Sequence, residues 1–235
     1  MTSHEYMLEA RGLCKTYRNG AVPLEVLKGI DLQIAEQGFV AVTGPSGAGK
    51  STLLHLLAGL DVPTEGEVLW KGRSLSSLSD RERARFRNRT VGVVFQFYHL
   101  LPELSALENV MLPGLVNGQG SRRALRERAL EVLSQVGLKD RALHTPSQLS
   151  GGELQRAAIA RALINQPTMI LCDEPTGNLD SNTGQHVVEV LMGLHRRQGM
   201  GLVLVTHEHA LAELADRWIE LRDGRVVADK PRRTP

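Results

Sequence analysis

The chain has 235 residues, of which 42% are hydrophobic and 23% are charged, so it is long enough for one large domain with its own core. Its formal net charge of +2 argues against a dedicated nucleic-acid-binding protein, because such proteins carry a strong basic excess. Only two cysteines occur, Cys14 and Cys172, so a disulfide framework is not expected and a reducing compartment fits.

Neither secretion nor membrane insertion is indicated. The first residues, MTSHEYMLEARG, lack a basic region followed by an apolar stretch. No apolar run approaches the roughly 18 to 20 residues that cross a bilayer. Any membrane association is therefore expected to be peripheral.

Short apolar runs and helical patterns alternate along the chain. The apolar runs precede glycine-rich or acidic turns and cover Phe39–Val42, Val91–Phe95, Met169–Cys172 and Leu202–Val205. The helical patterns cover Ser51–Leu60, Arg122–Val136 and Glu153–Ile164. This alternation predicts an α/β fold with a mostly parallel sheet covered on both faces.

The pattern also predicts how the chain is divided. Residues of about 97–165 have few β-branched runs and read as a helical subdomain, inserted into a core of about 1–96 and 166–230. Trp218–Leu221 and Arg225–Val227 flank Asp223-Gly224, a dipeptide typical of hairpin turns. Residues 231–235 would form a short tail.

The segment GPSGAGKS matches the phosphate-binding loop in full, between a predicted strand and a predicted helix. Glycines let backbone N–H groups face phosphates, Lys50 would reach the outer phosphates, and the Ser51 hydroxyl would bind Mg²⁺. An ordinary glycine turn is the weaker alternative in this context. The residues expected to contact the nucleotide here are Gly44, Pro45, Ser46, Gly47, Ala48, Gly49, Lys50, Ser51 and Thr52.

Two acidic residues, Asp173 and Glu174, end an apolar strand at the edge where parallel sheets bind ligands. Asp173 is expected to hold Mg²⁺, and Glu174 to orient and polarise the attacking water. The alternative is a pair of solvated acids in a loop.

Ser150 and Glu153 form a capping-box pattern, which by itself needs no functional explanation. Gly151 and Gly152, however, have no side chains, so the backbone N–H groups at this helix start would be accessible to a phosphate. The chain would then have two phosphate-facing helix starts, which requires either closure of the chain or a second subunit.

Together these motifs resemble the nucleotide-binding subunit of ATP-binding cassette (ABC) transporters, from Leu8 to about Val227. The resemblance implies a P-loop NTPase core with antiparallel β elements at the ends and an inserted helical subdomain. It also implies ATP and Mg²⁺ as cofactors, and a homodimer in which the Lys50 site of one copy faces Ser150–Glu153 of the other.

The resemblance assigns further roles. Tyr17 would stack on adenine, although a simple surface tyrosine is the alternative; Asp180 would belong to the loop that connects the two sites. His207 would contact the γ-phosphate, and Gln96 would sense Mg²⁺ and the membrane partner. The expected catalytic residues are therefore Glu174, His207, Lys50 and Gln96, and the expected metal ligands are Ser51, Gln96 and Asp173.

Within the family, segments 51–61, 96–110 and 173–180 look like those of lipoprotein-releasing ATPases. This implies separate permease subunits that dock near Gln96–Leu104, at the cytoplasmic face of the bacterial inner membrane. The apolar residues of this segment could instead belong to the core of the helical subdomain. Macrolide-efflux and cell-division types remain alternatives. So do soluble ABC proteins and, more weakly, a phosphate-loop kinase, which would not need the family's signature, the segment LSGGE at 149–153.

Alternate arginines at 81, 83, 85, 87 and 89 invite a nucleic-acid or lipid-headgroup site. Their spacing distributes them around a helix, so a solvated helix capped by Ser79 and Glu82 is the better interpretation, and no nucleic-acid partner is expected.

Overall fold

The computed structural model describes residues 6–18, 22–118 and 120–231. The chain forms two compact units: the first contains residues up to Arg87 and from Gly201 onward, and the second contains Asn88–Met200. The predicted division into a core and a helical subdomain of about 97–165 stays a prediction, and residues 232–235 of the expected tail lie outside the described part.

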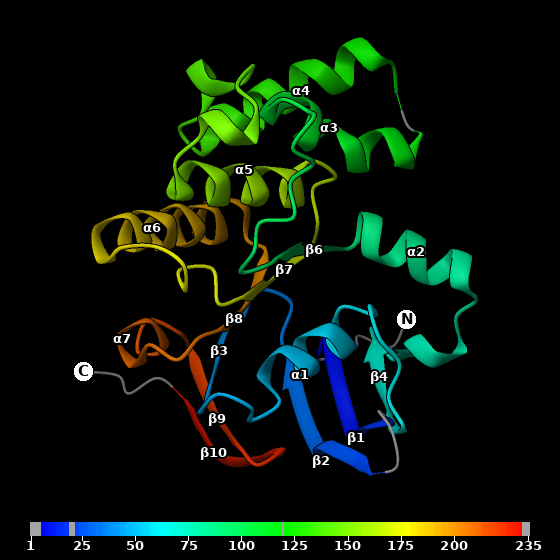
Figure 1. The fold of residues 1–235 in the computed structure, drawn as a ribbon. Helices are drawn as coiled ribbons and strands as arrows, with labels where there is room; N and C mark the ends of the chain where they lie inside the picture. Colours follow the sequence, from blue (N-terminus) through cyan, green and yellow to red (C-terminus); the bar gives the residue numbers. More distant parts are fainter. Residues whose placement is uncertain (1–5, 19–21, 119, 232–235) are drawn as a thin grey trace. The chain divides into compact units, whose positions relative to one another are not determined.

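The first unit contains an antiparallel sheet in the order β2-β1-β4-β5 (Figure 1). Its strands are β1 (Leu8–Arg18), β2 (Pro23–Ile34), β4 (Glu65–Trp70) and β5 (Arg73–Ser74). Leu8 pairs with Ile34 on one side and Trp70 on the other. The alternation of buried and exposed residues along the second half of β2 is typical of a strand with one face on the core.

The same unit holds a second group of strands, in the order β10-β9-β3-β8. They are β3 (Phe39–Thr43), β8 (Gly201–Val205), β9 (Arg217–Arg222) and β10 (Arg225–Pro231). β3 runs parallel to both β8 and β9, while β10 returns antiparallel after the predicted Asp223-Gly224 turn. Every residue of β3 and β8 is buried, which is why these strands read as continuous apolar runs.

Three helices accompany these strands: α1 (Lys50–Leu57), α2 (Asp80–Arg89, crossing the boundary between the units) and α7 (His209–Ala212). A short 3₁₀ turn spans Leu75–Ser77. The predicted cap of α2 is confirmed, because the Ser79 backbone N–H donates to Glu82 and the Glu82 N–H donates to the Ser79 hydroxyl. The predicted helix Ser51–Leu60 ends early, at Leu57.

The second unit pairs β6 (Val91–Val94) in parallel with β7 (Met169–Asp173). Its helices are α3 (Ala106–Asn117), α4 (Arg122–Gln135), α5 (Gly151–Leu163) and α6 (Ser181–Gln198), with 3₁₀ turns at Lys139–Arg141 and Pro146–Gln148. α5 contacts α3, α4, α6 and β6, and Figure 1 shows it between α6 and the α3–α4 pair. Its run of small residues, Ala157–Ala160 around one isoleucine, is fully buried and allows this close packing.

The α/β class with a mostly parallel sheet and antiparallel ends is confirmed. Three helices, α3, α6 and the short α7, were not predicted. Among the described residues, no helix combines the length and apolarity needed to cross a membrane.

Candidate nucleotide site

The phosphate loop follows β3 and leads into α1, as predicted. Gly44 adopts φ 148°, and a Cβ there would collide with the carbonyl oxygen of Leu221, so no other residue fits at the first loop position. Pro45, Ser46 and Gly47 at the tip are exposed. The loop therefore presents its backbone to solvent at the start of a helix, which is where an anion is stabilised.

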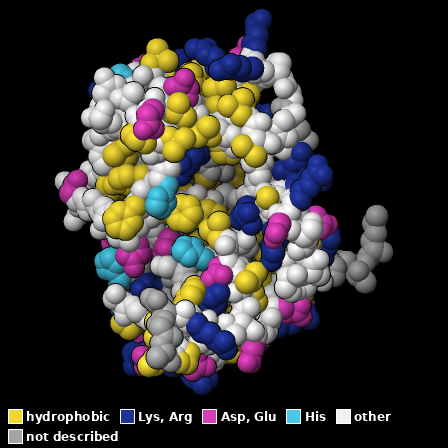
Figure 2. Space-filling model, turned by 45° about the vertical axis from the view of Figure 1, so that its right-hand side comes forward, with side chains coloured by type: hydrophobic (Ala, Val, Ile, Leu, Met, Phe, Trp, Pro, Cys, Tyr) yellow, Lys and Arg dark blue, Asp and Glu magenta, His cyan; other side chains and the backbone are white. Residues whose placement is uncertain are grey.

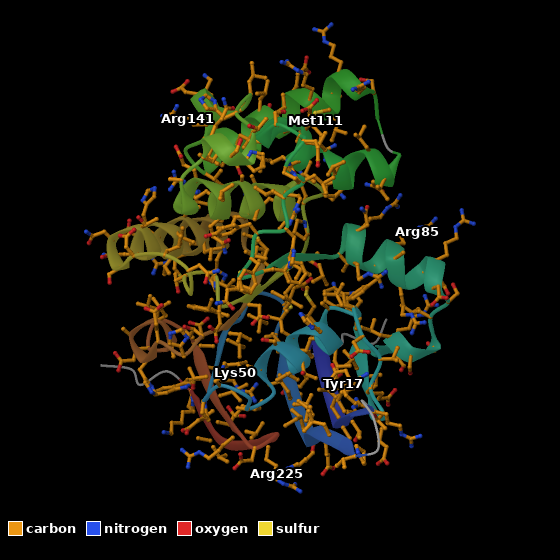
Figure 3. All side chains as sticks on the ribbon, viewed as in Figure 1. Tyr17, Lys50, Arg85, Met111, Arg141 and Arg225 are labelled. Atoms are coloured by element: carbon orange, nitrogen blue, oxygen red, sulfur yellow. The ribbon has the colours of Figure 1, made fainter. Side chains whose placement is uncertain are left out.

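Lys50, only 6% exposed, points back across this loop. Its Nζ donates hydrogen bonds to the carbonyl oxygens of Gly44 at 3.0 Å and Pro45 at 3.1 Å. Ser51 and Thr52 follow in the first turn of α1, and Figure 3 marks Lys50 and Tyr17 within this first unit.

His207 leaves the sheet at the same edge as the loop. Val42 of β3 pairs with Val205 of the parallel strand β8, and the Thr206 N–H donates to the carbonyl oxygen of Val42. The Thr206 hydroxyl accepts from the backbone N–H of Glu208 at 3.0 Å, which fixes the turn around His207. Lys50 and His207 are thus carried by neighbouring strand ends within one unit.

Tyr17 lies near the end of β1 and is partly exposed. Its hydroxyl donates to Asp61 Oδ2 at 2.9 Å. Burial and this hydrogen bond raise the pKa of Tyr17, although a hydrogen bond with Thr52 opposes them.

In the second unit, Gln96 and the acidic pair also leave neighbouring parallel strands. Val94 of β6 pairs with Cys172 of β7, so the segments that follow both strands start at one edge. Asp173 is 9% exposed, and Glu174 has φ 42°, a left-handed conformation that is strained for a non-glycine residue. Such strain is concentrated at functional sites.

The loop after Glu174 contacts Gln96 through Asn178. The Gln96 amide donates to Asn178 Oδ1 at 3.4 Å, and the Asn178 amide donates to the Gln96 carbonyl at 3.1 Å. Asp180 then caps α6 by accepting from the Thr183 N–H at 3.1 Å. Hydrogen bonds from the side chain and the backbone of Thr183 lower the pKa of Asp180. The contact between Gln96 and Asn178 joins two segments that the family resemblance singles out, because Asn178 lies in the loop that ends at Asp180.

The predicted capping box at the start of α5 is confirmed. The Ser150 N–H donates to Glu153 Oε2 at 2.8 Å, and Glu153 Oε1 lies 3.4 Å from Arg141 Nε. Hydrogen bonds from Ser150 and the nearby arginine lower the pKa of Glu153, although burial opposes them. The carboxylate is thereby held at the helix start in its ionised form, and Arg141 partly offsets its negative charge beside the Gly151–Gly152 turn.

Gly152 has a packing reason to be glycine as well. A Cβ there would collide with the Cγ2 methyl of Thr183, in the first turn of α6, whereas a Cβ on Gly151 would lie 3.2 Å from the nearest atom, Leu179 Cδ2. The start of α5 is therefore seated on the start of α6, which Asp180 caps.

Two residues that sequence reasoning missed, Arg161 and Asn109, hold the segment after Gln96. The Arg161 guanidinium donates to the carbonyl oxygens of Tyr98, at 2.7 Å, and His99. The fully buried side chain of Asn109 accepts from the Leu101 N–H and donates to the carbonyls of Leu101, Leu104 and Ser105. The Ser105–Glu108 capping box just before Asn109 is the one sequence signal that could have located α3.

Comparison with known proteins agrees with this arrangement. The ABC transporter family model matches residues 27–177. The lipoprotein-releasing system ATP-binding protein LolD of Xanthomonas campestris pv. campestris is 54% identical over 220 residues, covering 94% of this chain and 92% of that protein. LolD of Syntrophus aciditrophicus is 50% identical over 221 residues, covering 94% and 99%.

The fold also matches a solved structure. The ATP-binding cassette MJ0796, solved as a dimer in a post-hydrolysis state bound to ADP and Pi, superposes with a TM-score of 0.90 at 43% identity. The match covers 97% of this chain and 100% of that one.

Proposed function

The chain belongs to the ABC transporter family as an ATP-hydrolysing cassette, and from this premise we propose that it powers lipoprotein release through a separate membrane permease. The observation that carries the proposal is the identity of 50–54% to LolD proteins across 94% of the chain. We place it at the cytoplasmic face of the bacterial inner membrane, as a peripheral subunit.

In this proposal Lys50 and the loop N–H groups bind the nucleotide phosphates. The Mg²⁺ ligands in this proposal are the Ser51 hydroxyl, the Gln96 side-chain oxygen and the largely buried carboxylate of Asp173, an all-oxygen set that suits this hard cation. When bound, the ion neutralises phosphate charge.

Glu174 accepts the proton of the attacking water, and His207 holds the γ-phosphate. The backbone conformation of Glu174 supports this assignment. A strained conformation persists only where the surrounding structure holds it, so the position of the Glu174 residue is well defined. Tyr17 stacks on the adenine.

A second copy of the chain completes each site. The support is the bare helix start at Gly151–Gly152, whose N–H donors and dipole suit a phosphate, together with the dimeric state of the MJ0796 structures. Ser150–Glu153 of one copy would close on the ATP that Lys50 of the other holds, and Asp180 would connect the two sites.

The permease would dock on the segment Gln96–Leu104. Phe97 is 68% exposed and Leu101 is 47% exposed, and Figure 2 shows hydrophobic side chains gathered on one face at the height of α3, α4 and α5. Arg161 of α5 binds the backbone at Tyr98, so a displacement of this segment would pass to the helix that begins with the signature.

Affinity purification of tagged Glu174→Gln from mild-detergent membranes, with ATP and Mg²⁺, tests the proposal. A lipoprotein-release permease pair should co-purify, identified by mass spectrometry. The matched control, Lys50→Ala/Glu174→Gln, should lose the ATP-dependent part of the association. A single efflux-type permease would move the assignment to macrolide-type transport, and the absence of any membrane protein would contradict a permease-coupled role.

A further inference from the structure

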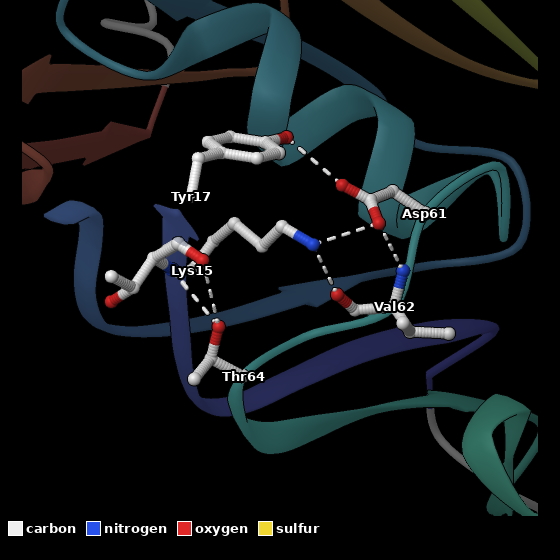
Figure 4. A network of polar contacts seen from close by, with 6 residues as sticks. Lys15, Tyr17, Asp61, Val62 and Thr64 are labelled. Carbon is white, nitrogen blue, oxygen red and sulfur yellow. Dashed lines mark hydrogen bonds and ion pairs between the residues drawn. The ribbon is translucent and has the colours of Figure 1, made fainter. Parts of the chain in front are cut away.

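The Tyr17 ring is held by a network of Lys15, Asp61 and Val62, three residues that lie outside the predicted nucleotide contacts (Figure 4). Lys15 Nζ donates to Asp61 Oδ1 and to the Val62 carbonyl oxygen, both at 2.8 Å, while Asp61 Oδ2 accepts from the Tyr17 hydroxyl. The Lys15 ammonium also lies over the Tyr17 ring, 4.8 Å from its centroid. One carboxylate thus joins the lysine and the tyrosine.

The geometry of β1 explains why these two side chains meet. Lys15 and Tyr17 are two residues apart on a strand and therefore project from the same face. The strand edge is fastened to the turn that carries Asp61, because Thr16 N donates to the Thr64 hydroxyl and Thr64 N donates to the Cys14 carbonyl. The network is therefore built on two backbone segments that are fixed to each other.

The charges of the network are partly shielded from water. Lys15 is 8% exposed, unlike most surface lysines. Burial acts to raise the pKa of Asp61, but hydrogen bonds from Lys15, the Val62 N–H and Tyr17 outweigh it and hold the pKa below its ordinary value. Rotating the Tyr17 ring away would leave this carboxylate with one hydrogen bond fewer and remove the ring from the cation.

We infer that Lys15 and Asp61 are positioning residues that fix the Tyr17 ring for stacking on the nucleotide base. Lys15 covers one face of the ring, so the base takes the opposite face. The inference rests on the proposed function, because base stacking by Tyr17 is part of that proposal. In this arrangement Lys15 makes no contact with phosphate, because its ammonium already contacts Asp61, the Val62 carbonyl and the Tyr17 ring.

The test compares a ligand that has a base with one that does not. Isothermal titration of the full chain would measure the affinity for ATP and for inorganic tripolyphosphate, in wild type, Lys15→Met and Asp61→Asn. We expect each variant to weaken ATP binding by about 3- to 10-fold, the range of one aromatic or cation–π contact, and to leave tripolyphosphate affinity unchanged. In steady-state assays KM for ATP should rise while kcat stays at the wild-type value.

Two further variants separate positioning from general damage. Lys15→Met added to Tyr17→Ala should weaken ATP binding no further than Tyr17→Ala alone, because the lysine acts through the ring. Lys71→Met is the matched control: Lys71 makes an exposed ion pair with Glu36, also at 2.8 Å, and its loss should leave both affinities unchanged.

Each contrary outcome is distinct. An equal loss of tripolyphosphate affinity, or an additive loss in the double variant, would overturn the positioning role of Lys15. If Tyr17→Ala weakens ATP binding but Lys15→Met and Asp61→Asn do not, the inference fails while the stacking of Tyr17 stands. If Tyr17→Ala leaves ATP affinity unchanged, base stacking itself is wrong and the positioning role falls with it.

Discussion

Lys50 Nζ and the Gly44 carbonyl oxygen are joined by a 3.0 Å hydrogen bond across the phosphate loop. The cation of the loop is therefore held by the loop's own backbone, and the side chain is almost completely shielded. We expect a phosphate that enters to replace these neutral carbonyl acceptors with an anionic one, which adds Coulomb attraction to the hydrogen bond from the ammonium. We propose that this exchange contributes to nucleotide binding by the first unit.

Replacing Lys50 by alanine should weaken ATP binding by about 10- to 100-fold, the value of a lost charge-assisted hydrogen bond. Isothermal titration measures the effect, and Lys71→Ala, an exposed lysine of the same unit, is the control that should bind ATP normally. An unchanged affinity in Lys50→Ala would rule out its phosphate-binding role.

The signature helix predicts a rescue experiment. Gly152→Ala should lower the melting temperature and the ATPase rate, because the new methyl collides with Thr183 Cγ2. Thr183→Ser removes that methyl and should restore most of both in the double variant. Gly151→Ala, with its nearest atom at 3.2 Å, is the matched control and should lower the melting temperature less. No recovery in the double variant would show that the collision is not the cause.

Asn109 should be a major contributor to stability. Its fully buried amide makes four hydrogen bonds to the backbone of residues 101–105, so Asn109→Ala should lower the free energy of unfolding by about 2–4 kcal/mol. Chemical denaturation measures this value. Asn182→Ala, at an exposed position of α6, should stay within about 0.5 kcal/mol of wild type. Equal stabilities of the two variants would contradict the account.

The cap of α2 predicts a pH dependence. Hydrogen bonds from the Ser79 hydroxyl, the Ser79 N–H and Arg73 lower the pKa of Glu82 from 4.5 to about 2. Because the folded pKa is the lower one, the stabilisation is present above pH 4.5 and is lost as the pH falls towards 2. Melting temperatures of wild type and Glu82→Gln should differ above pH 5 and converge as the pH falls from 4.5 towards 2. A difference in melting temperature that does not change with pH would contradict this role of Glu82.

The sequence predicted most of what lies close together along the chain. The phosphate loop, the acidic pair and the signature each combine a strand end or helix start with residues that have direct backbone reasons to occur there. α3 was missed because Pro113 interrupts its pattern, although its capping box was visible. α6 was missed despite buried Val187, Leu191 and Leu194 at helical spacing.

The supporting contacts could not be predicted, because they join residues far apart in the sequence. The Tyr17 hydroxyl reaches Asp61 across 44 residues, Gln96 reaches Asn178 across 82, and Arg161 reaches Tyr98 across 63. Such contacts depend on the packing of whole elements, which periodicity and local motifs do not specify.

The central claim, that ATP joins two copies and that Glu174 hydrolyses it, is tested most directly with Glu174→Gln. Light scattering after size-exclusion chromatography would give its molar mass with and without ATP and Mg²⁺, beside an ATPase assay. We predict a stable dimer with ATP only, and turnover reduced about 10²- to 10⁴-fold relative to wild type. A molar mass that is the same with and without ATP, or turnover at the wild-type rate, would contradict the account.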